Sequence, residues 1–263
     1  MHPIRQETFV KKVFLKILRL LNYKWVNWYK LGERQQIWYL KKLFKLYEID
    51  LVIDAGGNLG QYASFLRNKV GYEGKIITIE PMQFAADALR AKFKNDKNWS
   101  LEQCAVSDVA GFAEFNILRG HQMSSMLQPS SSTTDVLEDL QTIVEKVTVQ
   151  VKTLDSIFDK HPFCEYNNVY LKLDIQGKEL EALNGCSNNL QKVIALQAEL
   201  NVVAIYEGMH KYFDLMKEIE SLGYILSFLP AHSYRIFPDM IDFDAHFVKK
   251  SKMAEKGYLK NAI

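Results

Sequence analysis

The chain has 263 residues, 48% of them hydrophobic and 24% charged, so it is long enough to bury the core of one large domain. Its three scattered cysteines lack CxxC spacing, which argues against a disulfide framework or a structural zinc site. No apolar run approaches the roughly 18 residues of a membrane span, and basic residues interrupt the N-terminal apolar stretch that a signal peptide needs. These features predict a soluble, cytoplasmic α/β protein.

The first 48 residues form a basic segment. Residues 1–50 hold 11 Lys/Arg and 4 Asp/Glu, whereas the other 213 hold 22 and 27. Apolar residues recur at i, i+3 and i+4 over residues 8–21, which predicts an amphipathic helix, and Trp and Tyr alternate with Lys and Arg as far as residue 42. Two interpretations stay open. The segment caps the core or forms a homo-oligomer face, or residues 8–42 make peripheral contact with the inner face of an anionic membrane.

Residues 49–250 alternate strand and helix patterns. Expected strands are 51–54, 75–80, 100–105, 169–174 and 193–199, and expected helices are 61–70, 85–93, 179–190 and 212–222. The last strands, 224–229 and 245–249, are close enough in sequence to pair antiparallel at an edge. This order predicts an α/β fold with a mostly parallel sheet and helices on both faces. The acidic body gives no reason to expect nucleic acid as a partner.

Residues 111–152 interrupt the alternation. Strand-like pieces at 112–117 and 147–151 flank a polar, Ser-rich loop at 120–135, so we expect a β-hairpin insertion with a long loop. Loops of that length in a compact domain are often lids or substrate loops. Residues 251–263 are expected to be a C-terminal tail.

The first strand ends in a glycine turn, Asp54–Gln61 (DAGGNLGQ). Glycines allow a sharp turn close to a ligand, and the helix that follows points free N–H groups at that ligand. Glu80, at the end of the second strand, is placed to accept hydrogen bonds from ribose hydroxyls. The turn could hold NAD or S-adenosylmethionine. Because the Asp54 carboxylate would repel a pyrophosphate and attract the ammonium of a methionine moiety, the pattern favours S-adenosylmethionine.

From about Ile49 to Lys249 the sequence resembles the FkbM family of S-adenosylmethionine-dependent methyltransferases. The resemblance is carried by VIDAGGNLGQ (52–61), ITIEP (77–81), CAVSD (104–108), SSML (124–127), LKLDIQGKELEALNG (171–185) and FDAHFV (243–248). The turn reads DAGGN where the family more often has DVGAN, and both replacements are small. The resemblance implies the Rossmann-like class I methyltransferase fold with seven strands, and methyl transfer to an oxygen, commonly a sugar hydroxyl of a polysaccharide or glycolipid.

By matching positions, the resemblance also implies the cofactor site. The methionine part and ribose would lie among Asp54, Gly56, Gly57, Asn58, Gly60 and Gln61, the ribose hydroxyls on Glu80 beside Pro81, and the adenine near Cys104 and Ala105. Asp174, at the end of its strand, is a further candidate for cofactor contact.

Removing the proton of a sugar hydroxyl requires a base, a metal ion or both, because such a hydroxyl is a very weak acid. Asp174 and Glu199 end neighbouring strands in the expected order, so they form either a base with its partner or a Mg²⁺ site. Their alternative role is capping or salt-bridging. His121, in the predicted lid, is a further candidate base, whereas His246 inside an apolar strand is expected to be a core histidine. Candidate acceptor contacts are Ser124, Ser125, Tyr206 and Glu207.

Two competing functions remain. An NAD-linked Rossmann oxidoreductase is disfavoured by Asp54 and by the lack of a Tyr-x-x-x-Lys motif in the sequence. A non-catalytic S-adenosylmethionine-binding subunit of a glycan-assembly complex is disfavoured by Asp174 and Glu199. The leading prediction is therefore an O-methyltransferase that acts on a carbohydrate or glycolipid acceptor.

Overall fold

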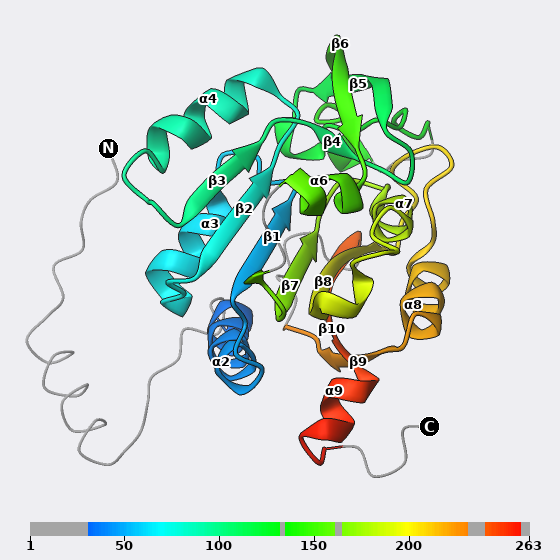
Figure 1. The fold of residues 1–263 in the computed structure, drawn as a ribbon. Coiled ribbons are helices and arrows are strands. Elements are labelled where there is room, and N and C mark those ends of the chain that lie inside the picture. The colour runs from blue at the N-terminus through cyan, green and yellow to red at the C-terminus, as the bar shows by residue number, and fades with distance from the viewer. Residues whose placement is uncertain (1–30, 132–134, 161–164, 231–239, 259–263) are drawn as a thin grey trace, which may run out of the picture.

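A computed structural model describes residues 31–131, 135–160, 165–230 and 240–258, so the helix expected over 8–21 lies outside the described residues. A seven-stranded sheet in the order β3-β2-β1-β7-β8-β10-β9 forms its centre (Figure 1). The first five strands in that order are parallel, and β10 runs antiparallel to both of its neighbours. The strands are β1 (Leu51–Ala55), β2 (Lys75–Ile79), β3 (Trp99–Glu102), β7 (Val169–Leu173), β8 (Val193–Asn201), β9 (Tyr224–Phe228) and β10 (Asp242–Lys249).

Helices cover both faces of this sheet, as predicted (Figure 1). The central strands β1 and β7 are buried along their whole length, which is why apolar residues make up most of each strand. One face packs against α6 (Leu154–Lys160), α7 (Glu179–Asn184) and α8 (Tyr212–Ser221). The other packs against α2 (Leu31–Leu46), α3 (Gln61–Phe65), the π-helical turn η2 (Leu66–Val70) and part of α4 (Gln83–Lys92). The predicted seven-stranded α/β fold is confirmed.

On the face that α2 and α3 cover, the sheet changes from apolar to polar along the strands. Residues two apart on one strand share a face of the sheet, and the strand register aligns the residues of neighbouring strands in rows. The apolar row is Val52, Tyr170, Ala195 and Val248, and the next row is Asp54, Lys172, Gln197 and His246. Asp174, Glu199 and Asp244 follow two residues further along, with Glu199 and Asp244 directly paired. The polar rows therefore meet at the carboxyl ends of the parallel strands.

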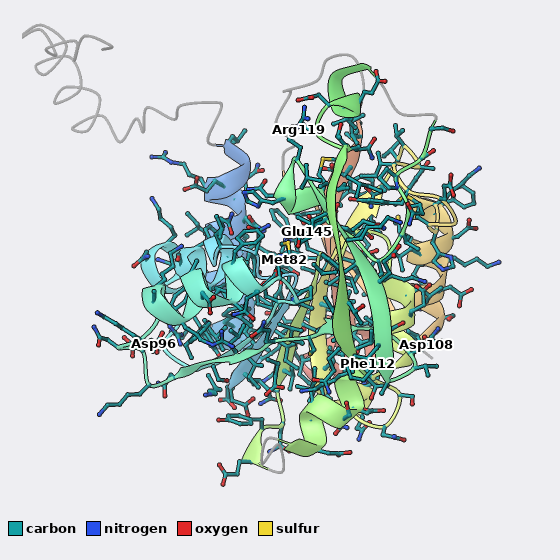
Figure 2. The ribbon with its side chains drawn as sticks, turned by 90° about the horizontal axis from the view of Figure 1, so that it is seen from above. Met82, Asp96, Asp108, Phe112, Arg119 and Glu145 are labelled. Atoms are coloured by element: carbon teal, nitrogen blue, oxygen red, sulfur yellow. The ribbon has the colours of Figure 1, made fainter. Side chains whose placement is uncertain are left out.

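A smaller three-stranded sheet lies over that end of the molecule. The predicted hairpin is confirmed, since β5 (Gly111–Leu118) pairs antiparallel with β6 (Ile143–Lys152). Seen from above, the hairpin crosses the top of the molecule, with Phe112 near one end and Arg119 near the other (Figure 2). The third strand, β4 (Ala105–Val106), pairs with β6. The single strand expected over 100–105 is thus wrong: β3 ends at Glu102, and β4 joins the other sheet.

Further boundaries and short elements differ from the expectations. The helix expected over 179–190 ends at Asn184, and Gly185 after it packs against the backbone of Ser107, where a Cβ would lie 2.3 Å from the carbonyl oxygen. β8 continues to Asn201 because β10 pairs along its whole end, so Glu199 lies inside a strand. Short helical pieces, η3 (His121–Met123) and α5 (Asp135–Glu138), occupy the predicted loop, and α9 (Lys250–Glu255) follows β10. None of the described helices is long and apolar enough to span a membrane.

Candidate active site

The glycine turn at the end of β1 requires a glycine at position 56. Gly56 has φ +85°, and a Cβ there would lie 1.8 Å from the carbonyl oxygen of Asp174. Only a residue without a side chain lets the turn approach the end of β7 this closely. Asn58 also has a positive φ, 45°, which asparagine tolerates. The turn therefore lies directly against the loop that follows Asp174.

A cavity of about 600 Å³ opens beside this turn, between the strand ends and the small sheet. Most predicted site residues line it: Gly56, Gly57, Asn58, Gln61, Glu80, Pro81, Cys104, Ala105, His121, Ser124, Asp174 and Glu199. Five do not: Asp54, Gly60, Ser125, Tyr206 and Glu207. The wall also contains residues that sequence reasoning did not single out, among them Lys172, Gln176, Gln197 and Asp244.

Glu80 holds the turn and faces the cavity. Its carboxylate accepts hydrogen bonds from the backbone N–H of Asn58 at 2.8 Å and of Met82 at 2.9 Å. Burial raises the pKa of Glu80 to about 7, although the two N–H groups act in the opposite direction. Its remaining lone pairs are available to the hydroxyl donors of a ligand.

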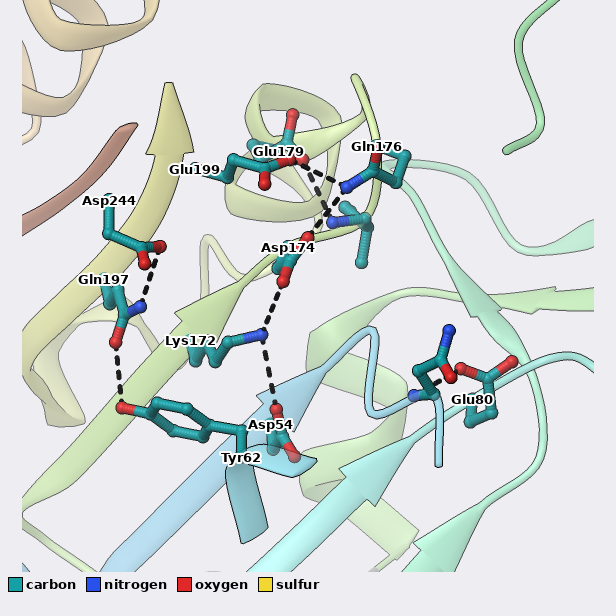
Figure 3. Close-up of polar contacts among 12 residues, drawn as sticks. Asp54, Tyr62, Glu80, Lys172, Asp174, Gln176, Glu179, Gln197, Glu199 and Asp244 are labelled. Atoms are coloured by element: carbon teal, nitrogen blue, oxygen red, sulfur yellow. Dashed lines mark hydrogen bonds and ion pairs between the residues drawn. The ribbon is translucent and has the colours of Figure 1, made fainter. Parts of the chain in front are cut away.

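Lys172 is a buried cation between two carboxylates (Figure 3). Its Nζ lies 2.9 Å from Asp174 Oδ2 and 3.7 Å from Asp54 Oδ1. Burial alone would lower the pKa of Lys172, but the charges of Asp174 and Asp54 outweigh it and raise that pKa. Asp54 is fully buried, and neither of its oxygens has a hydrogen bond, so burial raises its pKa while Lys172 lowers it. Asp54 is therefore paired with an internal ammonium behind the cavity wall.

Gln176 joins the two candidate catalytic carboxylates. Its Nε2 donates to Asp174 Oδ1 at 2.9 Å and to Glu199 Oε2 at 2.7 Å (Figure 3). The Tyr206 hydroxyl donates to Gln176 Oε1 at 2.8 Å, which fixes the orientation of the amide. Gln176 also has a positive φ of 58°, and its carbonyl accepts a hydrogen bond from Ser125 at 2.7 Å. Tyr206 and Ser125 thus contact the loop behind the cavity and shape it from there.

A second amide positions Asp244. Gln197 Nε2 donates to Asp244 Oδ1 at 2.8 Å, and the Tyr62 hydroxyl donates to Gln197 Oε1 at 2.8 Å. Tyr170 lies 3.2 Å from the same Oε1 and 2.8 Å from His246 Nδ1. Burial lowers the pKa of His246 to about 3, so this histidine is neutral, as expected of a core histidine.

The cavity wall is strongly acidic. Five carboxylates line it, whereas Lys172 is the one Lys or Arg among the described residues of the wall. Burial raises the pKa of Glu199 well above its usual range, and the neighbouring charges of Asp174, Asp242 and Asp244 raise it further. A wall of this composition attracts cationic ligands and repels phosphates. The lining carboxylates are Glu80, Asp174, Glu199, Asp242 and Asp244.

The predicted lid contacts the glycine turn. Asn58 Nδ2 lies 3.2 Å from His121 Nδ1 and 3.4 Å from the His121 carbonyl oxygen, and the Phe84 ring meets the imidazole edge-on. Ser124 Oγ accepts a hydrogen bond from the Leu118 N–H at 3.1 Å, so it supports the lid backbone. Glu207 is exposed outside the cavity. His121 therefore links the predicted lid to the glycine turn at the cavity wall.

The residues present do not fit the Mg²⁺ expected between Asp174 and Glu199. Asp174 already receives the Lys172 ammonium on one oxygen and the Gln176 amide on the other, and the same amide bonds to Glu199. A divalent cation there would lie next to a buried ammonium, which is unfavourable. Within the described parts of the chain, no group of three or more His, Cys, Asp or Glu residues could hold a metal ion.

One family model matches the chain. The model of the methyltransferase FkbM domain matches residues 54–236, which is more than half of the chain. No curated protein matches the sequence. The structure is similar to the methyltransferase FkbM from Methylobacillus flagellatus KT, with 17% identity and a TM-score of 0.47, over 76% of this chain and 44% of that one. The chain thus spans less than half the length of that protein.

Two other solved structures are similar at lower identity. One is the magnesium protoporphyrin IX methyltransferase ChlM from Synechocystis PCC 6803 with bound SAM, at 12% identity, a TM-score of 0.44, and 92% and 93% coverage of the two chains. The other is fibrillarin from Aeropyrum pernix in complex with S-adenosyl-L-methionine, at 12% identity, a TM-score of 0.44, and 84% and 76% coverage.

Proposed function

The chain belongs to the FkbM methyltransferase family, and from this premise we propose that it transfers the methyl group of S-adenosylmethionine to a hydroxyl of a sugar in a polysaccharide or glycolipid. The observation that carries the proposal is the charge of the cavity at the glycine turn. Five carboxylates and one lysine line it, and that lysine is already paired with Asp174 and Asp54. A sulfonium cofactor is attracted to such a wall, whereas the pyrophosphate of NAD is repelled.

The turn and Glu80 fit the cofactor. Gly56 lets the turn lie against the Asp174 backbone, and Glu80 presents a carboxylate to the cavity between two backbone N–H groups. When bound, S-adenosylmethionine supplies an electrophilic methyl carbon. The adenine would lie toward Cys104 and Ala105, which line the same cavity next to Pro81. The methionine end would then lie toward Asp174.

Asp174 and Glu199 would act as one unit. The Gln176 amide bridges their carboxylates, and the Lys172 ammonium forms an ion pair with Asp174. Burial and the neighbouring carboxylate charges raise the pKa of Glu199 well above its usual range, so Glu199 is the member of the pair suited to accept a proton. In the proposed step, the acceptor oxygen forms a bond to the methyl carbon as the carbon–sulfur bond breaks, and the hydroxyl proton passes to the carboxylate pair. No step requires a metal.

The first experiment is a calorimetric titration of the protein with S-adenosylhomocysteine and, separately, with NAD. Micromolar binding of the thioether and none of NAD supports the cofactor assignment. Binding of NAD alone would overturn it in favour of an oxidoreductase. Binding of the thioether without methyl transfer from radiolabelled cofactor to any polysaccharide or glycolipid fraction would instead favour a non-catalytic subunit.

The second experiment tests the carboxylate pair. Asp174→Asn and Glu199→Gln should each lower turnover by at least about 100-fold, as loss of a general base does. Affinity for S-adenosylhomocysteine should change little in Glu199→Gln. Glu207→Gln is the control, because Glu207 is exposed outside the cavity and should leave both quantities unchanged. Full turnover in both pair variants would refute the assignment.

A further inference from the structure

The helix α2 has one apolar face and one basic face. Tyr39, Leu40, Leu43 and Phe44 are buried against the sheet. The opposite side, which we call the basic face of α2, is exposed and consists of Arg34, Trp38, Lys41, Lys42 and Lys45. The positions follow a spacing of i, i+4, i+7, i+8 and i+11, so their side chains form one stripe. Among the described residues, no ion pair involves the four basic side chains.

Trp38 is the unusual member of this face. Its side chain is 63% exposed, although an indole ring normally buries most of its apolar surface. Four cations surround it on the same stripe. An exposed Trp among Lys and Arg residues is the pattern of helices that lie in a lipid headgroup layer, where the ring enters the interface and the cations meet anionic headgroups.

The rest of the molecule restricts which anionic partner would fit. Residues 51–263 carry five more acidic than basic side chains, so a partner that wraps the body would be repelled. A planar surface can touch the basic face alone. One acidic residue near the stripe, Glu33, lies 4.0 Å from Lys69 and is partly neutralised by it.

The same helix also forms part of the cavity wall. Gln36, on the side of α2 between the two faces, lines the cavity, and its Nε2 lies 3.4 Å from His246 Nε2. A surface in contact with α2 therefore lies close to the site where the acceptor would bind. This proximity matters for an acceptor that is itself part of a membrane.

We propose that the basic face of α2 docks on an anionic membrane surface and holds the cavity beside it. The docking itself does not depend on the chemistry of the site. Its consequence, that the acceptor is a glycolipid or a lipid-linked glycan, rests on the proposed function.

Vesicle cosedimentation of the full chain tests the proposal. The wild type should bind vesicles of phosphatidylcholine and phosphatidylglycerol, bind pure phosphatidylcholine weakly, and lose binding as salt is raised. Each Lys or Arg near an anionic surface contributes about 1 kcal/mol, so Lys41→Glu/Lys42→Glu should lower the partition coefficient by at least about 30-fold. The single variant Trp38→Ala should also lower the partition coefficient on the same vesicles.

The matched control is Lys94→Glu/Lys97→Glu, which makes the same change in net charge at two exposed lysines between α4 and β3. It should bind vesicles within about twofold of wild type. An equal loss in both double variants would overturn the assignment to α2, as would equal binding of neutral and anionic vesicles. Binding to RNA instead of vesicles, weakened by the α2 changes, would assign the face to nucleic acid. Calorimetry with S-adenosylhomocysteine reports on the proposed function separately, because neither double variant alters the cavity wall.

Discussion

Replacing Lys172 by methionine should destabilise the protein in a pH-dependent way. The side chain keeps nearly the same length, but Asp54, which is fully buried and accepts no hydrogen bond, loses the cation 3.7 Å away. Removing one partner of a buried ion pair costs about 3–5 kcal/mol. Most of this loss should come from Asp54, because Asp174 is 32% exposed and water screens its part of the interaction.

The sign of the pH dependence follows from Asp54. Burial raises its pKa in the folded state and the charge of Asp174 raises it as well, whereas Lys172 lowers it, so removing Lys172 raises the pKa of Asp54 further. A group whose folded pKa is raised favours folding at low pH, and this contribution is lost as the pH rises through the folded pKa. The variant should therefore lose more stability, relative to wild type, at pH 8 than at pH 5.

Urea unfolding of wild type, Lys172→Met, Asp54→Asn and the double variant at both pH values measures the effect. The double variant should recover much of the loss, because it removes the unpaired charge. A loss below about 1 kcal/mol, an equal loss at the two pH values, or no recovery in the double variant would refute the pairing on which this reasoning depends.

Two further outcomes are expected. Because burial raises the pKa of Glu80 to about 7, calorimetric affinity for S-adenosylhomocysteine should fall up to about tenfold between pH 8 and pH 6, and Glu80→Gln should remove that dependence. Gly56→Ala should destabilise the fold by roughly 3 kcal/mol in chemical denaturation, because its methyl group would meet the Asp174 carbonyl at 1.8 Å. Gly71→Ala, which has a similar φ but open space around it, should cost only about 1 kcal/mol, and equal losses would contradict the steric explanation.

The sheet and the glycine turn could be predicted because their signals are local. Apolar residues that lead into Asp and Gly, as in Leu51–Gly56 (LVIDAG), mark a buried strand and the turn after it. Likewise, the LKLD pattern places Asp174 at a strand end, and its alternation puts Lys172 on the same face. The strand expected over 100–105 failed because the break at Glu102 depends on pairing between β4 and β6, more than 40 residues further along the chain.

The buried amides and Asp244 could not be predicted in the same way. Gln176 and Gln197 are amides without a recognisable motif, and each matters only because the fold brings a carboxylate and a tyrosine to its two ends. Asp244 reaches the cavity through its antiparallel register with Glu199, which no spacing within one segment reveals. The sequence predicts Tyr206 as an acceptor contact. Its hydrogen bond to Gln176 becomes visible only in the tertiary structure.

The two sides of the cavity come from different parts of the chain. The family match covers residues 54–236, which supply the glycine turn, Glu80 and the carboxylate pair. Gln36, Asp242 and Asp244 line the same cavity from α2 and β10, outside that region. Substitutions at these three positions therefore alter the cavity wall without changing the glycine turn or Glu80. The cavity thus extends beyond the matched region at both of its ends, and it is completed by one element before that region and one element after it.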